Sequence, residues 1–420
     1  MDAFGHIFRL PDLRKRFFFT LAMIAVYRLG SHVPIAGVDL NALKELFSQG
    51  GILSFVDLFS GGALGRFSIF ALGILPYINA SIIMQMLTFI WPKLKDLTQE
   101  GDAGRKQIAQ YTRYLAIGLA IIQGIVMSVG FRAFILPDVN VSFFIFYAVI
   151  GLVSGAALVM FIGEIMTEYG IGNGASLLIF VGIISQIPYY IKNTVTLLSG
   201  GTSPLMVVIM VAILIFMIIS IVFVQDGQRK VQVQYAKRVV GRKMMGGQST
   251  FIPLRLIQGG VLPIIFASAL LQFPMVLGNF TGIPAVQNFF SVYYRYDGVI
   301  YNGFFCILIF FFTYFYTAIS FNPKELAENI KKYGGFILGV RPGRPTEEYL
   351  ERIVTKLTFV GASFLAFVAL LPVIGASMTK VTSFSGLGGT AILIIVGVAL
   401  DFVKQIETYL LSRRYEGLID

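Results

Sequence analysis

Charged residues are scarce in this 420-residue chain, because Asp, Glu, Lys and Arg together make up 13% of it. Soluble proteins carry roughly 25% of such residues. Hydrophobic residues make up 56% of the chain, and the mean hydropathy is +0.79. This composition excludes a soluble enzyme and indicates an integral membrane protein.

Cysteine and histidine are also nearly absent, with one Cys and two His in the whole sequence. A single cysteine cannot form a disulfide within the chain. The sequence contains no GxxxxGK phosphate loop, no HExxH motif and no cluster of Cys and His. We therefore expect no metal site, no cofactor, no catalytic residues and no ATP hydrolysis by this chain.

Long apolar runs fill most of the sequence. A helix that crosses a bilayer needs about 20 predominantly apolar residues, and ten runs are candidates: 17–34, 67–91, 112–131, 143–165, 174–191, 205–224, 259–277, 299–319, 354–374 and 388–404. The segments between them hold 26 Lys and Arg on the amino-terminal side and six on the opposite side. By the positive-inside rule, we expect both termini in the cytoplasm.

The loop 192–204 divides the ten predicted helices into two sets of five. Because five is odd, two structurally related halves would be inverted relative to each other across the membrane. We expect an all-α membrane protein with an N-terminal half at 1–191, an external hinge loop at 192–204, a C-terminal half at 205–404 and a cytoplasmic tail at 405–420.

The interiors of the predicted helices lack carboxylates, histidines and lysines. Ion-coupled transporters and proton pumps place such groups inside the bundle. This absence disfavours a secondary transporter or lipid flippase, which is the main alternative class. The polar residues that do enter the helices are neutral, and they indicate either ordinary interhelical hydrogen bonds or one seam that is wetter than the rest.

Residues 52–59 are apolar but too few to span a bilayer, and they include Asp57 before a glycine-rich stretch at 60–66. Non-helical backbone at membrane depth is tolerated where protein or a water-filled cavity receives it. Two interpretations fit equally well. The segment is either a re-entrant half-helix or an amphipathic helix that lies on the external surface.

Two predicted cytoplasmic loops are long, 225–258 and 320–356, and each contains seven Lys and Arg. The alternation at 231–235 predicts a strand and a protruding basic hairpin. Such loops can simply anchor the topology on anionic lipid. Their length favours docking of an acidic or nucleic-acid partner.

Five stretches resemble the motifs of the SecY family, the central subunits of the bacterial protein-export channel. They are GGALGRFSIFALGILPYINASIIMQML (61–87), GEIMTEYGIGNGAS (163–176), DGQRKVQVQYAKR (226–238), FNPKELAENIKKYGGFILGVRPG (321–343) and SRRYEGL (412–418). The resemblance covers essentially the entire chain, in order. It implies a multi-pass channel of the bacterial inner membrane that exports unfolded secretory polypeptides and releases transmembrane segments into lipid through a lateral gate.

The resemblance also implies a role for particular residues. A pore ring of aliphatic side chains would comprise Ile74, Ile78, Ala175, Ile179, Ile265 and Ile394, although a bulkier residue than Ala175 is usual in the family. A plug at 52–66 would contain Leu53, Phe55, Val56, Leu58, Phe59 and Leu64. A lateral gate between the second and third predicted helices and the seventh and eighth would include Asn79, Gln85, Gln123, Ser268 and Phe273.

The partners implied by the resemblance are a motor or a ribosome together with small membrane subunits. The SecA ATPase or the ribosome would dock on two basic patches, formed by Lys237, Arg238, Arg242 and Lys243 and by Arg341 and Arg344. SecE and SecG would be the membrane partners. Signal sequences, nascent polypeptides and membrane lipids would be the other ligands.

Overall fold

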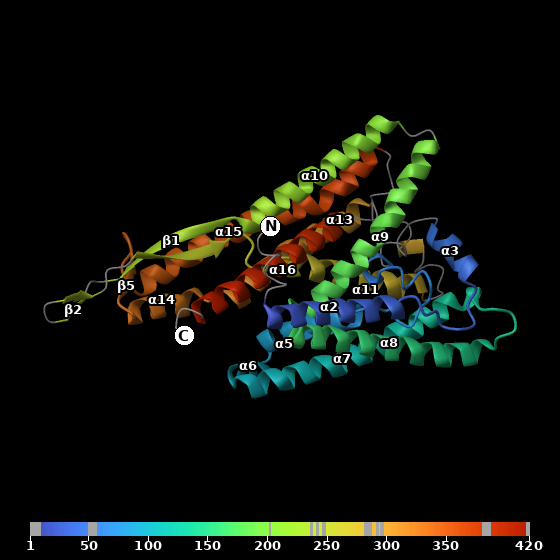
Figure 1. The fold of residues 1–420 in the computed structure, drawn as a ribbon, viewed down its shortest axis with the longest axis horizontal. Coiled ribbons are helices and arrows are strands. Elements are labelled where there is room, and N and C mark those ends of the chain that lie inside the picture. Colours follow the sequence, from blue (N-terminus) through green and yellow to red (C-terminus); the bar gives the residue numbers. More distant parts are fainter. Residues whose placement is uncertain are drawn as a thin grey trace.

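A computed structural model describes most of the chain, at residues 10–48, 57–200, 203–235, 238–240, 243–245, 249–280, 288–290, 294, 298–379 and 388–416. These residues form a helical bundle with a small sheet at one end (Figure 1). The helices before residue 200 are α2 (Pro11–Gly30), α3 (Leu40–Ser48), α5 (Leu75–Ile90), α6 (Pro92–Gln99), α7 (Asp102–Gly130), η1 (Phe131–Phe134), α8 (Val141–Tyr169) and α9 (Gly174–Ser199). Those after residue 200 are α10 (Pro204–Asp226), α11 (Leu262–Phe280), α13 (Val299–Ser320), α14 (Pro323–Lys332), α15 (Arg344–Thr379) and α16 (Gly388–Glu416).

Each of the ten predicted apolar runs overlaps a helix, namely α2, α5, α7, α8, α9, α10, α11, α13, α15 and α16. The second run is only partly helical, because residues 67–74 form turns and α5 begins at Leu75. Seven helices of the described chain are long and apolar enough to cross a membrane. Two more, α5 and α11, are shorter apolar helices, and α2 carries five charged residues in its 20. The chain is therefore a multi-pass, helical membrane protein.

Several helices extend beyond the limits that hydropathy predicts. α7 begins at Asp102 and α15 at Arg344, ten residues before the predicted starts, and α16 continues to Glu416 through most of the predicted tail. Beyond the first turn of α15, no proline interrupts these polar extensions. Hydropathy marks where a helix leaves the apolar layer, whereas the helix itself ends where its backbone pairing ends.

The predicted hairpin is confirmed as an antiparallel pair of β1 (Gln228–Tyr235) and β4 (Ser249–Arg255). A third strand, β5 (Gly335–Ile337), comes from the other long loop and pairs with β1, so the sheet order is β4-β1-β5. Val231, Val233, Leu254 and Ile337 pack against α14 and the start of α15 in one apolar core. The two basic loops thus form a single folded unit. A second pair, β2 (Arg238–Val240) and β3 (Lys243–Met245), extends from its tip.

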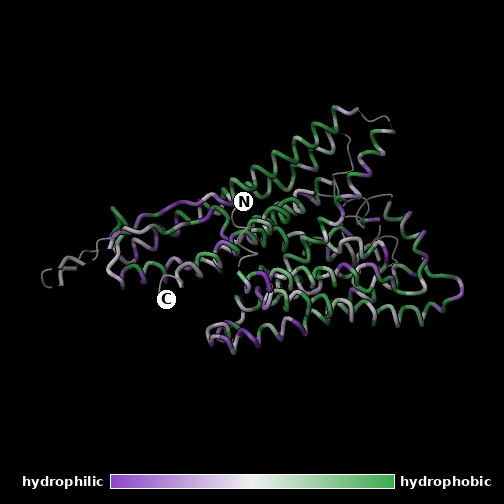
Figure 2. The backbone as a smooth tube through the Cα atoms, in the orientation of Figure 1, coloured by the Kyte–Doolittle hydropathy of each residue, from purple (hydrophilic) through white to green (hydrophobic). Residues whose placement is uncertain are grey.

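The sheet and α14 lie at one end of the elongated molecule, here called the sheet end, and α3 lies at the opposite end, here called the α3 end (Figure 1). Figure 2 shows that apolar residues dominate the helices between these ends, while hydrophilic residues gather toward the ends. This banding is what a bilayer requires.

The halves of the bundle meet along two sets of helices. α11 packs against α5 and α7, and α16 packs against α9. Between them lies a large apolar cluster built from helices of both halves. A second cluster, within the N-terminal half, packs around Phe67, Phe131 and Phe144 at the α3 end.

Candidate functional site

The six predicted ring residues converge on the apolar cluster between the halves, although they come from four helices and the turn before α5. Ile74, Ile78, Ile179, Ile265 and Ile394 are each at most 5% exposed. Ala175 is half-buried and packs against the same cluster. The structure therefore brings together residues that lie up to 320 positions apart in the sequence.

The residues at the start of α9 determine where this helix begins and therefore which of its side chains face the cluster. Asn173 caps α9, because its side-chain oxygen accepts a hydrogen bond from the Ser176 backbone N at 3.1 Å. Gly172 precedes it with a φ of +90°, a conformation that favours glycine. A Cβ at Gly174 would collide with the carbonyl oxygen of Gly163, so this glycine lets α9 begin tightly against α8. This cap and these two glycines fix the start of α9, so that Ala175 and Ile179 face the apolar cluster.

The small side chain of Ala175 is backed by close packing from α8. A Cβ at Gly163 would lie 3.3 Å from Ile74 Cδ1 and 3.6 Å from the Ala175 backbone N. The α8 backbone at Gly163 therefore lies directly against Ile74 and the start of α9.

The described part of the predicted plug is buried inside the bundle. Leu58, Phe59 and Leu64 are each at most 3% exposed, and Leu58 and Phe59 belong to the apolar cluster that contains the ring residues. Leu53, Phe55 and Val56 lie outside the described residues. The burial favours the re-entrant interpretation over a helix on the surface. A separate amphipathic helix, α3, is present between α2 and this segment, and the sequence analysis missed it.

Polar side chains of α2 and α9 bond to the backbone of this segment. Arg28 donates hydrogen bonds from Nη1 to the Gly61 carbonyl oxygen at 2.9 Å and to Ser185 Oγ at 3.0 Å. The Tyr27 hydroxyl donates to the Ser60 carbonyl oxygen at 3.3 Å. One charged side chain therefore ties the segment to helices on two sides.

Asp57 organises the turn that follows the segment's helix. Its Oδ1 accepts hydrogen bonds from the Gly65 backbone N at 2.9 Å and from Ser60 Oγ at 3.0 Å. Its Oδ2 lies 3.5 Å from Gln186 Nε2 on α9. Burial raises the pKa of the Asp57 carboxyl, while the bonds from Gly65 and Ser60 and the charge of Arg66 act to lower it.

Gly61 lets the segment approach α9 at backbone distance. Its φ is +69°, and a Cβ built there would lie 2.9 Å from the Gly182 Cα. Any side chain at residue 61 would therefore push the segment away from α9. The sequence analysis noted the glycine-rich stretch 60–66, and the spacing of Gly61 and Gly65 is typical of close backbone approach, but it could not reveal the partner helix.

The predicted gate helices are in contact, with α5 and α7 on one side and α11 and α13 on the other. The Tyr316 hydroxyl of α13 donates a hydrogen bond of 2.8 Å to Gln85 Oε1 of α5. Nearby, the rings of Phe89 and Phe315 meet edge to face with centroids 5.7 Å apart. Tyr316 was missed by the sequence analysis, because one tyrosine in an aromatic-rich helix carries no distinguishing signal.

The other predicted gate residues lie on the same group of helices. Asn79 of α5, Gln123 of α7 and Ser268 of α11 are buried, whereas Phe273 is half-buried. Ser268 Oγ donates to the Ile265 carbonyl oxygen one turn earlier, at 2.8 Å.

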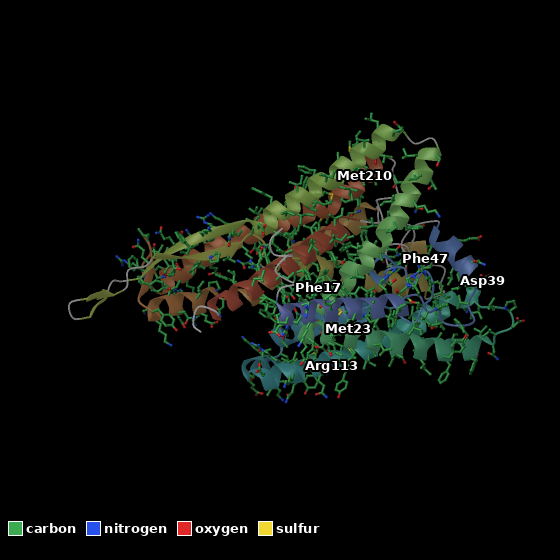
Figure 3. The ribbon with its side chains drawn as sticks, viewed as in Figure 1. Phe17, Met23, Asp39, Phe47, Arg113 and Met210 are labelled. Carbon is green, nitrogen blue, oxygen red and sulfur yellow. The ribbon has the colours of Figure 1, made fainter. Side chains whose placement is uncertain are left out.

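One ion pair joins α7 and α8. Arg113 Nε of α7 lies 2.8 Å from Glu164 Oε1 of α8. Figure 3 shows Arg113 on α7, while Asp39 and Phe47 lie at the α3 end. Among the described residues, no group of three or more His, Cys, Asp and Glu could hold a metal ion.

A cavity of about 290 Å³ lies between the start of α9 and the second half of α16. Ser176 and Leu177 line one wall, and Arg255, Asp401 and Lys404 contribute charged groups. Leu177 also belongs to the apolar cluster that contains the ring residues, so the cavity borders this cluster.

The predicted docking residues are placed unequally. Arg341 and Arg344 are exposed at the sheet end, and Arg344 Nε lies 3.4 Å from Glu348 Oε1. The sequence analysis expected Arg344 in a loop, whereas the structure makes it the first residue of α15. Arg238 and Lys243 lie in β2 and β3, while Lys237 and Arg242 fall outside the described residues.

Comparisons with known proteins agree with this architecture. Residues 68–403 match the SecY family model. The protein translocase subunit SecY of Thermotoga maritima is 42% identical over 429 residues, which cover 100% of this chain and 97% of that protein. A solved structure described as that of a protein conducting channel aligns with a TM-score of 0.66 and 19% identity, covering 95% of this chain and 93% of that one.

Another solved structure, Sec61 in the canine ribosome-channel complex from the endoplasmic reticulum, aligns with a TM-score of 0.62 and 18% identity over 95% of this chain and 93% of that one. The structural likenesses establish a shared fold. The match to the family model spans most of the chain, and the bacterial relative matches it from end to end. This chain belongs to the SecY family.

Proposed function

We propose that this chain is the pore-forming subunit of a protein translocase, through which unfolded polypeptides cross a membrane. It is a channel subunit and not an enzyme. The observation that carries the proposal is the cluster of buried aliphatic side chains from four helices and the turn before α5, at the interface between the two halves. An apolar constriction blocks ions by dewetting, and flexible aliphatic side chains can close around a passing chain of any sequence.

The segment 52–66 would seal this constriction from the α3 end. Support comes from the burial of Leu58, Phe59 and Leu64 and from the hydrogen bonds that Arg28 and Tyr27 make to its backbone. These bonds are few, so the segment can leave without unfolding the bundle around it.

The seam between α5 and α7 and α11 and α13 would serve as the lateral gate. Its closed state is held by neutral contacts such as the Gln85–Tyr316 hydrogen bond. Single interhelical hydrogen bonds in membranes contribute about 1 kcal/mol. Contacts of this strength can be exchanged for contacts with a signal sequence, which would then reach lipid.

We infer that the sheet end is cytoplasmic, because 26 of the Lys and Arg lie on that side and six on the other. The chain would lie in a bacterial inner membrane with both termini in the cytoplasm. Arg341, Arg344 and the tip around β2 and β3 would dock a ribosome or the SecA motor. SecE and SecG would complete the membrane complex, and SecA would supply ATP hydrolysis.

Site-specific crosslinking tests the pore assignment. A photoreactive residue at Ile78 or Ile265 should crosslink to a stalled secretory chain in membranes supplied with SecA, ATP and SecE. A photoreactive residue at Leu152, which is equally buried but belongs to the second cluster, is the control and should not crosslink. With an engaged chain, absence of adducts at both Ile78 and Ile265 would place the path elsewhere and refute the proposal.

A further inference from the structure

The amphipathic helix α3 covers one end of the segment 52–66. Leu43 of α3 is fully buried in the second apolar cluster, and Leu64 at the end of the segment belongs to the same cluster. Phe47, one turn further along α3, packs against this cluster and stacks with Phe131, with ring centroids 6.5 Å apart. α3 and the end of the segment therefore share one apolar core.

Phe47 lies directly over Gly65, in the turn that Asp57 organises. A Cβ built on Gly65 would lie 3.5 Å from Phe47 Cγ, which is ordinary van der Waals distance. The Gly65 backbone N donates to Asp57 Oδ1 at 2.9 Å, and this hydrogen bond closes the turn. The ring of Phe47 therefore packs against the backbone of the segment itself, with no side chain between them.

Residues 31–39, here called the strap, hold the start of α3 in place from two sides. The Ile35 backbone N donates to the Phe67 carbonyl oxygen at 2.9 Å, in the chain that follows the segment. The Asp39 backbone N donates to the Phe134 carbonyl oxygen at 2.9 Å, in the loop between α7 and α8. α3 therefore reaches the segment from a fixed point on the bundle.

The contact between Phe47 and Gly65 exists only while the segment is seated in the bundle. When the segment leaves, the apolar surface that the ring and the turn bury against each other is lost. The contact therefore stabilises the closed channel and contributes nothing to the open one. The strap, in contrast, bonds to chain on both sides of it that lies outside the segment, so the segment can move without breaking those bonds.

We propose that Phe47 is a positioning residue that holds the end of the segment 52–66 in the closed channel, and that α3 is an external latch from which the segment separates when the pore opens. The proposal rests on the proposed function of this segment as a seal. It predicts that the strap and α3 stay in place while the segment moves away from Phe47.

The first test is resting ion conductance of the reconstituted channel with Phe47→Ala. Phe134→Ala is the matched control, because Phe134 is also half-buried, packs against the same cluster and lies 6.1 Å from Phe131 between ring centroids. Both variants should lower the thermal unfolding temperature. We expect Phe47→Ala to raise conductance about tenfold, equivalent to about 1.4 kcal/mol, and Phe134→Ala to change it less than about twofold. Equal conductance of the two variants would overturn the role of Phe47.

A reversible disulfide tests the latch in a protein that is folded at the outset. In a Cys306→Ser background, which removes the single native cysteine, Phe47→Cys is combined with Gly65→Cys. A sulfur at residue 47 takes about the place of Phe47 Cγ, 3.5 Å from the Cβ at residue 65, so the pair is within reach of a disulfide. Oxidation should lower SecA-driven export about tenfold, and a reductant should restore it.

The control pair is Val38→Cys with Ile135→Cys, which joins the strap to the loop between α7 and α8. Val38 and Ile135 are antiparallel bridge partners, a pairing whose Cα separation suits a disulfide. Its oxidation should leave export unchanged, because the strap does not move.

Failure of the pair at residues 47 and 65 to form a disulfide in the resting channel would overturn the latch, as would unchanged export after it forms or an equal loss for the control pair. Two measurements separate these outcomes from failure of the proposed function. Crosslinking at Ile78 shows whether the polypeptide uses the pore. Conductance after Arg28→Met, which removes a hydrogen bond to the segment, shows whether the segment seals it.

Discussion

Replacing Arg28 by Met should loosen the segment 52–66 and raise the resting ion leak. The guanidinium of Arg28 donates to the Gly61 carbonyl oxygen at 2.9 Å and to Ser185 Oγ at 3.0 Å. Met preserves the apolar stem of the side chain and removes both donors. Ser185 Oγ already donates a long hydrogen bond of 3.5 Å to the Gly61 carbonyl oxygen, and a bond of this length contributes little in place of the lost one.

The size of the effect follows from the one bond that Arg28 makes directly to the segment. A hydrogen bond from a charged group contributes about 1.5–3 kcal/mol. Because Arg28 is half-buried, water can partly replace the donor, and the lower value applies. A loss of about 1.5 kcal/mol raises the population with a displaced segment roughly tenfold.

The measurement is resting ion conductance of the reconstituted channel, without motor or substrate. Arg14→Met is the matched control, since Arg14 lies on the same helix but is exposed and near its opposite end. We expect a clear rise for the Arg28 variant and none for the Arg14 variant. Equal conductance of the two variants, with both proteins folded, would refute the reasoning that Arg28 holds the segment in place.

Three further predictions concern the gate, the packing and the docking surface. Tyr316→Phe removes the hydrogen bond to Gln85, worth about 1 kcal/mol. Because this weakens the closed gate, export of a weak-signal precursor should increase about fivefold. Gly155→Ala should lower the thermal unfolding temperature, because its Cβ would collide with the backbone of a neighbouring segment, whereas Gly118→Ala, with open space around it, should not. Arg341→Glu should impair motor- or ribosome-dependent transport in a translocation assay, while membrane insertion of the chain stays normal. Equal transport by the variant and the unaltered protein would show that this surface is not part of the docking site.

Hydropathy predicted the positions of the ten helices because bilayer thickness imposes a length on every apolar run. Hydropathy did not predict how far the helices extend beyond their apolar parts. α7, α15 and α16 continue past their apolar parts, since polar residues support helix as well as apolar ones. The hairpin was predicted from its alternation, but the added strand β5 was not, because three residues are too few to show a period.

The candidate site was also predicted from the sequence only in part. The neutral polar residues Asn79, Gln123 and Ser268 stood out from composition, and the structure buries all three. Arg28 gave no such signal. Its hydrogen-bond partners lie 33 and 157 residues away, and a sequence pattern reports only neighbours on one helix or strand.

By itself, the sequence determined that this chain is a helical membrane protein and to which family its motifs are similar, because these follow from local hydropathy and residue order. It also predicts, from the distribution of Lys and Arg, which way its loops face. The tertiary structure alone decided which side chains meet. The cluster around Ile78, Ile179, Ile265 and Ile394 and the hydrogen bonds of Arg28 both depend on distances between helices remote in sequence. Such distances are set by the packing of the whole bundle, in which every helix constrains its neighbours.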